Sequence, residues 1–156
     1  MNEIPAKPVT TIEIGDEIGP LTYSPTLDDI QRYGTEVRMV DQRFMSQEIA
    51  QQRGFQQAVV PGPLSATFLV RMLTKHFFGW RLQTLTISFR SPVRHGDTLT
   101  YLGTITQKEE QNRACIVHCD ILVENGNGDR CLVGTAVLCP RRAPVASTNN
   151  PTIVSK

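Results

Sequence analysis

Hydrophobic positions recur at a helical spacing in one stretch of the chain and at every second position in the stretches that follow it. From Pro63 to Gly79 the apolar residues fall three and four apart, which is the period of a helix with one face toward a core. Proline suits the first turn of such a helix. The members of this apolar stripe are Leu64, Phe68, Leu69, Met72, Leu73 and Phe77. The pattern predicts a long helix packed on a hydrophobic core.

Two shorter helices are predicted before the long one from their capping residues. Thr26 followed by Asp29 is typical of a capped helix start, and Gly34 is the expected stop. Ser46 can cap a second helix, which Gly54 would close.

After Trp80 the apolar residues alternate with polar ones, which predicts strands with one buried face. The predicted strands cover residues 84–90, 99–105, 115–123 and 131–139, and a further edge strand is expected around Thr10 to Gly15. The run from Asn125 to Asp129 is a strong hairpin signal, and Pro140 should end the last strand. A helix followed by a meander of antiparallel strands predicts an α+β domain with the helix on one face of a sheet.

Composition restricts the class of protein further. The 156 residues, 40% of them hydrophobic, fit one globular domain over residues 10–140, with flexible ends at residues 1–9 and 141–156. The formal net charge of +1 gives no electrostatic footprint for nucleic acid. No apolar run approaches the roughly 20 residues needed to cross a bilayer, and the start lacks the apolar core of a signal peptide. We therefore expect a cytoplasmic protein with no nucleic-acid or membrane partner.

The four cysteines are expected to be free thiols. Cys115 and Cys119 flank His118 in a tempting metal-like pattern. On a strand, however, the two sulfur-bearing residues would lie about 13 Å apart, with the histidine on the other face. We expect no metal site, no cofactor, and an outward-facing His118. His76, near the end of the long helix, is expected to lie at the negative end of the helix dipole.

The segment from Tyr33 to Pro63 has the spacing of an acyl-thioester hydratase site. It matches the MaoC-like (R)-hydratase pattern at Ala50, Gly54, Phe55, Val59 and Gly62. Together with the later P-V-x-x-G-D-T-L turn and V-E-N-x-x-G hairpin, the chain resembles the MaoC-like domain family. The resemblance implies a hot-dog fold, in which a curved antiparallel sheet wraps around the long helix. It also implies a dimer with an acyl-thioester tunnel near the subunit boundary.

The chemistry departs from that pattern. Met39, Phe44 and Pro61 stand where the family has its catalytic Asp, its catalytic His and a second His. Methionine and phenylalanine have no exchangeable proton, and losing one general acid or base typically costs about 10² to 10⁴ in rate. A second device of the family persists, because Gly62 at the helix N-terminus can donate its N–H to a thioester carbonyl. The neighbouring Pro63 has no N–H to donate.

This departure is similar to the non-catalytic half of two-part MaoC-like dehydratases. There an acidic residue, an aromatic and a later proline occupy the positions of Asp41, Phe44 and Pro61. The first hypothesis is therefore a substrate-binding subunit of a 3-hydroxyacyl-thioester dehydratase or enoyl hydratase, taking acyl-CoA or acyl-ACP and working as a homodimer or with a catalytic MaoC-like subunit. The substrate-binding residues that it predicts are Tyr33, Met39, Phe44, Pro61, Gly62, Pro63 and Leu64.

Two alternatives stay open. The homodimer could itself be a hydratase, dehydratase or thioesterase that uses Asp41 as catalytic base, with Tyr33 or His95 and the Gly62 N–H. A packed Tyr33 ring, a structural Asp41 and a solvent-exposed His95 are the plainer interpretations. The other alternative is a module that sequesters an acyl ligand without chemistry. Four arginines could bind the phosphate of CoA or of a phosphopantetheine arm, although surface roles are commoner for arginine: Arg90, Arg94, Arg141 and Arg142.

Overall fold

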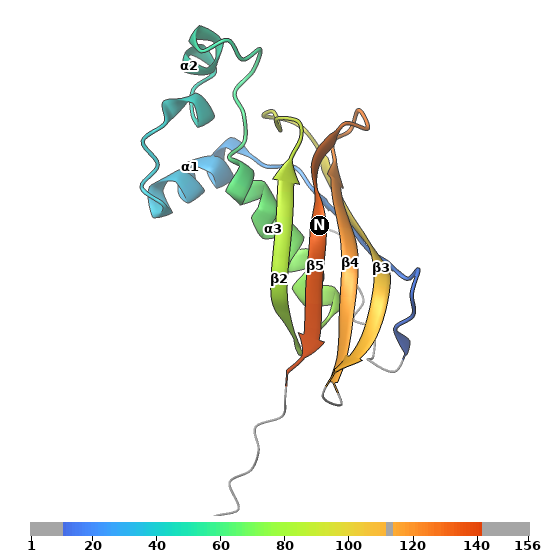
Figure 1. Ribbon diagram of the computed structural model, residues 1–156. Coiled ribbons are helices and arrows are strands. Elements are labelled where there is room, and N and C mark those ends of the chain that lie inside the picture. Colours follow the sequence, from blue (N-terminus) through green and yellow to red (C-terminus); the bar gives the residue numbers. More distant parts are fainter. Residues whose placement is uncertain (1–10, 112–113, 142–156) are drawn as a thin grey trace, which may run out of the picture.

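A computed structural model of the chain describes residues 11–111 and 114–141, and within them one long helix lies against one sheet (Figure 1). The elements are β1 (Glu17–Tyr23), α1 (Leu27–Glu36), the 3-10 helix η2 (Gln42–Phe44), α2 (Gln47–Gln52), α3 (Gly62–His76), β2 (Trp80–Phe89), β3 (Leu99–Gln111), β4 (Ala114–Glu124) and β5 (Arg130–Pro140). Flexible ends were expected at residues 1–9 and 141–156, and all of these residues except Arg141 lie outside the described residues.

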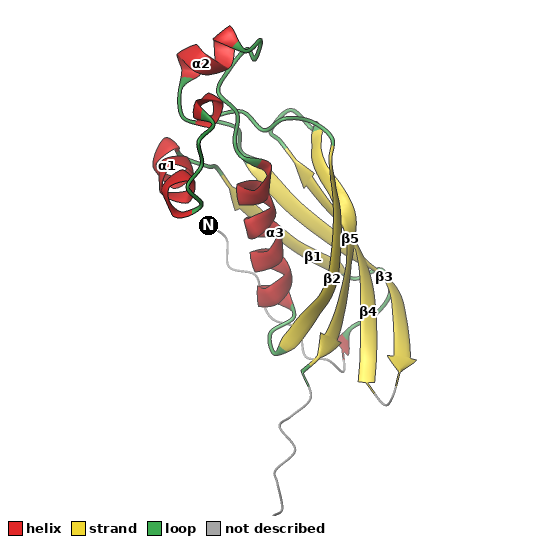
Figure 2. Ribbon diagram, turned by 60° about the vertical axis from the view of Figure 1, so that its left-hand side comes forward, coloured by secondary structure: helices red, strands yellow, loops and turns green. Residues whose placement is uncertain are grey.

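The five strands form a single antiparallel sheet in the order β1-β3-β4-β5-β2. The predicted hairpin between β4 and β5 is confirmed, with Asn125 N–H donating to Asp129 O at 3.0 Å. α3 lies along one face of the sheet, and α1, η2 and α2 gather beyond its N-terminal end (Figure 2). The predicted α+β arrangement of a helix on an antiparallel sheet is therefore confirmed.

The core lies between α3 and the sheet. The predicted stripe of α3 is confirmed, since Leu69, Met72 and Leu73 are fully buried and Phe68 is partly buried. From the sheet, the alternating residues of β3 meet this stripe, with Leu99 and Tyr101 fully buried. Burial of these side chains away from water is the main force that holds helix and sheet together.

The edge strand was predicted in the wrong place. Residues 11–16 form a turn and irregular backbone, and the strand is β1, whereas Thr10 lies outside the described residues. The observed strand contains Gly19 and Pro20. The strand tolerates them because β1 is at an edge of the sheet, where a missing N–H need not pair, and because its register with β3 shifts between Ile18 and Leu21.

The capped short helices are largely as predicted. Thr26 caps α1 in a capping box with Asp29, and Ser46 caps α2. The stop of α1 was wrong, because the helix continues through Gly34 to Glu36. Gly34 is buried, and a Cβ atom there would lie 3.2 Å from the Met45 methyl carbon. This glycine therefore serves the packing of the η2 segment on α1 rather than ending the helix.

The cysteines are free thiols, as predicted, and Cys119 and Cys131 are buried. His118 is half-buried and pairs with Glu109 across the β3–β4 ladder at 3.3 Å. Within residues 11–111 and 114–141, no three His, Cys, Asp or Glu side chains are grouped so that they could hold a metal ion. His76 is buried at the end of α3, with its ring centroid 5.0 Å from that of Phe77.

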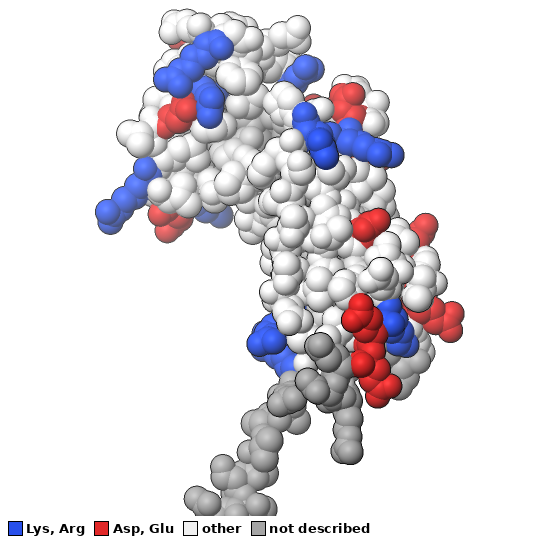
Figure 3. All heavy atoms as spheres, in the orientation of Figure 1, with Lys and Arg blue, Asp and Glu red and all other residues white. Residues whose placement is uncertain are grey.

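Lys and Arg side chains collect toward the two ends of the face drawn in Figure 3, and acidic side chains also lie at mid-height along its right-hand side, so the uncharged area is the left-hand part of the middle. On β2 the side chains of Thr84, Thr86 and Ser88 are exposed. None of the described helices is long and apolar enough to span a membrane.

Candidate functional site

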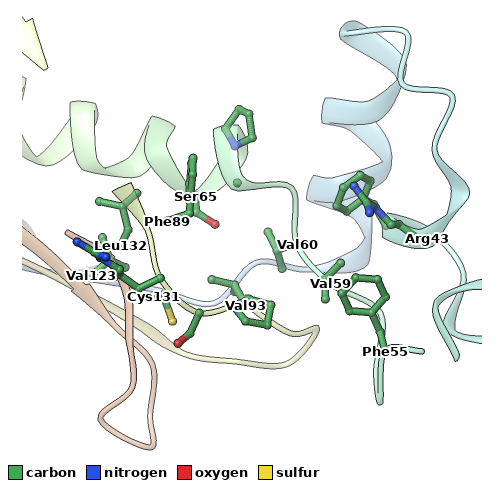
Figure 4. A pocket seen from close by; sticks show the side chains of 16 residues that line it. Arg43, Phe55, Val59, Val60, Ser65, Phe89, Val93, Val123, Cys131 and Leu132 are labelled. Carbon is green, nitrogen blue, oxygen red and sulfur yellow. The ribbon is translucent and has the colours of Figure 1, made fainter. Parts of the chain in front are cut away.

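A cavity of about 460 Å³ opens beside the N-terminal end of α3, between that helix and the ends of β2, β4 and β5 (Figure 4). Its volume lies within the range of about 300–1,000 Å³ typical of small-ligand pockets. Most of its walls are apolar. The lining residues are Arg43, Phe44, Phe55, Val59, Val60, Gly62, Pro63, Ser65, Phe89, Arg90, Ser91, Pro92, Val93, Val123, Cys131 and Leu132.

The segment leading into α3 forms one wall because it pairs with the loop after β2. Val60 N–H donates to Val93 O at 2.8 Å, and His95 N–H donates to Ala58 O at 2.9 Å. These bonds make a short antiparallel bridge around Val59. They fix where the first turn of α3 meets the sheet, and so they fix the position of the cavity.

In the first turn of α3 one backbone N–H has no hydrogen-bond acceptor among the described residues. Leu64 and Ser65 N–H groups both donate to Pro61 O, at 3.1 and 3.2 Å, and Pro63 has no N–H. Gly62 is the remaining donor of this turn, and it lines the cavity. A helix N-terminus carries partial positive charge, so this end of the cavity favours an oxygen that bears or develops negative charge.

A second wall comes from η2 and the chain after α2. The guanidinium of Arg43 lies 4.7 Å from the ring centroid of Phe44 and 5.9 Å from that of Phe55. The same guanidinium pairs with Asp41 at 2.9 Å, and Arg53 pairs with that carboxylate at 3.1 Å. Asp41 also caps η2 by accepting the Arg43 N–H. Asp41, which is not itself part of the lining, therefore holds Arg43 and η2 in place in this wall.

The described lining contains no Asp, Glu, His, Lys or Tyr side chain. Its ionisable groups are Arg43, Arg90 and Cys131. Burial raises the pKa of the Cys131 thiol, and the nearby Asp97 and Asp129 carboxylates raise it further, so the thiol holds its proton at neutral pH. Arginine keeps its proton throughout. The described lining therefore offers no side chain that would exchange a proton near pH 7.

Three of the residues predicted to bind substrate line this cavity: Phe44, Gly62 and Pro63. The lining does not include Tyr33, Met39, Pro61 or Leu64, nor the candidate base Asp41. The Tyr33 ring packs against the core, as its plainer interpretation predicted. Pro61 and Leu64 are buried beside the cavity, and Met39 N–H bonds to Gly34 O at 2.8 Å after α1.

The prediction that His95 is solvent-exposed was wrong. The ring is half-buried, and its Nε2 lies 3.0 Å from Phe44 O, where it donates to that carbonyl. The ring thus fixes η2 to the loop after β2. Among the arginines, Arg90 lines the cavity, and Arg94 and Arg141 are exposed and outside the lining. Arg142 lies outside the described residues.

Several lining residues were not found from the sequence. Val123 and Leu132 lie opposite each other on β4 and β5, and their alternation predicted burial but not a cavity. Ser65 was missed as well. It precedes Phe68 and Leu69 by three and four residues, so a polar residue within the apolar stripe was the available signal.

Solved structures with the same arrangement support the hot-dog fold. An (R)-hydratase from A. caviae involved in PHA biosynthesis has a TM-score of 0.78 at 18% identity, over 85% of this chain and all of its own. The ChsH1-ChsH2 complex from Mycobacterium tuberculosis gives 0.73 at 16% identity, covering 84% and 99% of the two chains. The HadBC (3R-hydroxyacyl-ACP dehydratase) complex from Mycobacterium tuberculosis gives 0.67 at 21%, again covering 84% and 99%. No curated protein sequence matches the chain significantly.

The fold and the site together define a hot-dog protein of the hydratase and dehydratase type. The family model described as "MaoC like domain" matches residues 44–124, more than half of the chain. This protein belongs to the MaoC-like domain family.

Proposed function

We propose that this protein is the substrate-binding, non-catalytic subunit of a 3-hydroxyacyl-thioester dehydratase or enoyl-thioester hydratase. In this proposal the cavity beside α3 takes the acyl chain of a CoA or carrier-protein thioester. The proton transfers are made by a catalytic MaoC-like partner.

The observation that carries the proposal is a cavity of about 460 Å³ with mostly apolar walls and no proton-exchanging group in its described lining. Addition of water across a double bond, or its removal, needs one group to give and another to take a proton. Arg43 and Arg90 stay charged, and the raised pKa of Cys131 leaves that thiol a poor base. The walls supply affinity for an apolar chain, whereas the protons must come from elsewhere.

The polar end of the cavity supports a thioester as the ligand. The unspent Gly62 N–H at the start of α3 can donate to the thioester carbonyl oxygen, and the helix dipole adds to that attraction. Pro63 and Phe44 would flank the acyl group there, with Pro61, Leu64, Tyr33 and Met39 behind them. A carbonyl bound in this way is placed for a partner's acid and base.

The edge strand β2 supports the need for a second subunit. It runs ten residues and pairs with β5 on one side, and it is at the edge of the described sheet. From Gln83 to Phe89 its exposed residues are uncharged, and long uncharged edges are prone to pair with another strand. Two of the similar structures are complexes, ChsH1-ChsH2 and HadBC, and we carry that arrangement to this chain as part of the proposal.

Reconstitution tests the proposal. The purified protein is assayed alone and with MaoC-like chains that carry an intact D-x-N-P-x-H motif and are encoded beside it, using the hydration of crotonyl-CoA followed by loss of enoyl absorbance. Binding of octanoyl-pantetheine to the protein alone is measured by calorimetry. We expect binding without turnover by the protein alone, and turnover when a partner is added.

Three outcomes count against the proposal. Hydration by the isolated homodimer would favour a self-sufficient enzyme with a site around Asp41. Failure to bind the pantetheine thioester, alone or with every partner, would remove the thioester function altogether. Tight binding without turnover in any combination would leave a sequestering module.

A further inference from the structure

The hydroxyl of Ser65 is buried in the cavity without a hydrogen-bond partner among the described residues. Ser65 is 3% exposed, and its Oγ atom has no donor or acceptor within range in the described structure. The residue is in the first turn of α3 and belongs to the lining. Figure 4 shows the side chain directed from the helix into the cavity, toward the space beside Val60 and Val93.

Other hydroxyls of the same helix behave differently. Thr67 Oγ1 donates to Pro63 O at 3.0 Å, and Thr74 Oγ1 donates to Val70 O at 2.9 Å. This back-bonding to the preceding turn is the ordinary way in which a helix satisfies a hydroxyl. Ser65 does not use it, although Pro61 O is within reach of its N–H. A buried hydroxyl without a partner destabilises a fold, so its presence here calls for a partner that binds.

We infer that Ser65 hydrogen-bonds an oxygen on the third carbon of the bound acyl group. The protein would then select 3-hydroxyacyl and 3-oxoacyl thioesters over saturated ones. This inference rests on the proposed function, since it takes the ligand to be an acyl thioester with its carbonyl at Gly62. It adds Ser65 as the residue that recognises the oxygen on the third carbon of the acyl group.

The spacing of the two donors fits such a ligand. Gly62 and Ser65 are three residues apart on α3, so their side-chain positions lie about 5–6 Å apart on one face of the helix. Both residues line the cavity. A 3-oxygenated acyl thioester carries one oxygen on its carbonyl carbon and one on its third carbon, with a single carbon between them. The Gly62 N–H and the Ser65 hydroxyl, about one helical turn apart, can bind these two oxygens at the same time. The other wall residues near Ser65, Val60, Val93 and Leu132, have no side-chain polar atom to compete for the second oxygen.

The chemistry of the remaining wall assigns the role to Ser65. Arg43 is engaged by Asp41, and Arg90 is exposed at the end of β2. Cys131 Sγ donates to Asp129 O at 3.6 Å, and a thiol is a weak donor. Ser91 also lines the cavity but is only half-buried. Among the residues of the described lining, Ser65 is thus the one whose hydroxyl is both buried and without a hydrogen-bond partner.

The test compares two pantetheine thioesters of equal chain length, because pantetheine is common to CoA and carrier protein. Racemic 3-hydroxyoctanoyl-pantetheine and octanoyl-pantetheine are titrated by calorimetry into the wild-type protein, Ser65→Ala and the control Thr67→Ala. Thr67 is an exposed hydroxyl of the same helix with a backbone partner. Urea unfolding of the free proteins is measured in parallel.

We expect the wild type to prefer the 3-hydroxy compound by about three- to tenfold, the worth of one net hydrogen bond. Ser65→Ala should weaken the binding of the 3-hydroxy compound alone, so that the two compounds bind with similar affinity. Its unfolding midpoint in the free state should be unchanged or higher, because an unpaired hydroxyl has been removed. Thr67→Ala should keep the preference.

The outcomes separate the two proposals. Equal binding of both compounds by the wild type overturns the inference and leaves the thioester function standing. Equal weakening of both by Ser65→Ala also overturns it, since the hydroxyl would then serve the carbonyl or the packing. A lower unfolding midpoint of free Ser65→Ala with an unchanged preference would make the serine structural. If the wild type binds neither compound, the proposed function fails first and the inference with it.

Discussion

The ring of Phe89 packs against Gly62 on the side where a side chain would begin. A Cβ atom placed on this glycine would lie 2.8 Å from Phe89 Cε1 and 2.9 Å from its Cζ. Phe89 ends β2 and is 53% exposed, although it also lines the cavity. The contact therefore joins the last residue of an edge strand to the first residue of α3, beside the backbone donor proposed to hold the thioester.

Substituting this glycine should disturb the ring and the ligand together. Gly62→Ala is expected to lower the free energy of unfolding by about 1–3 kcal/mol, the usual cost of overpacking, and to weaken octanoyl-pantetheine binding as the ring moves into the cavity. Gly126→Ala is the control, since a Cβ there meets nothing within 4 Å. In a Phe89→Ala background the Gly62→Ala cost should shrink by at least about 0.5 kcal/mol. Equal costs in both backgrounds would show that the ring is not the obstacle.

The role of Asp41 is decided by a variant that removes charge and keeps shape. Asp41→Asn retains an oxygen to cap η2 but loses both ion pairs, so we expect a stability loss of about 0.5–1 kcal/mol. Binding of octanoyl-pantetheine and turnover by the reconstituted complex should be unchanged. Asp28→Asn, which breaks the exposed pair with Arg32, is the control. Turnover that disappears in Asp41→Asn while folding is intact would instead identify this carboxylate as a base.

The position of Arg90 leads to a prediction about how the CoA or carrier-protein arm is bound. It lines the cavity and is exposed, so it can meet a phosphate of CoA or of a phosphopantetheine arm. Arg90→Gln should weaken octanoyl-CoA roughly two- to fivefold at low salt and less at high salt, because exposed charge pairs are screened. Octanoyl-pantetheine, which has no phosphate, should bind as before. Arg81→Gln, at the far end of β2, is the matched control. An equal loss for both ligands would place Arg90 on the acyl group.

The raised pKa of the Cys119 thiol predicts that the protein loses stability at alkaline pH. Burial, assisted by the Asp120 carboxylate, raises the pKa of this thiol from an ordinary value of 9.0 to about 12. Between these values the folded protein keeps the proton and the unfolded chain releases it. Stability should therefore fall as pH rises above about 9, by up to about 1.4 kcal/mol per pH unit. The buried Tyr101 hydroxyl, whose pKa is also raised by burial, adds to the fall at higher pH.

Two substitutions at this position isolate the contribution. Cys119→Ala and Cys119→Ser both remove the titrating thiol, so both should flatten the fall between pH 8 and 10.5 in urea unfolding. Their stabilities at neutral pH should differ, because serine buries a hydroxyl in the core. A slope that is the same as that of the wild type in both variants would assign the alkaline loss to other groups.

Local patterns predicted the elements well wherever one face of an element meets the core. The stripe of α3 and the alternation in β3 depend on burial of every third or fourth, or every second, side chain. The capping box of Thr26 and Asp29 is contained within four residues. The errors arose where distant contacts decide: Gly34 makes room for Met45, and the position of the edge strand β1 depends on its pairing with β3.

The sequence by itself determined the family and the predicted elements, because these depend on residue identity and spacing along the chain. That Met39 and Phe44 replace the family's usual acid and base stays a prediction from the resemblance. Only the tertiary structure decided which side chains enclose the cavity. Val93, Val123 and Leu132 come from separate strands and loops, and the bonds between the segments before α3 and after β2 bring them to Gly62. The tertiary structure also decided that the Ser65 hydroxyl has no hydrogen-bond partner among the described residues, since that depends on every group that packs around it.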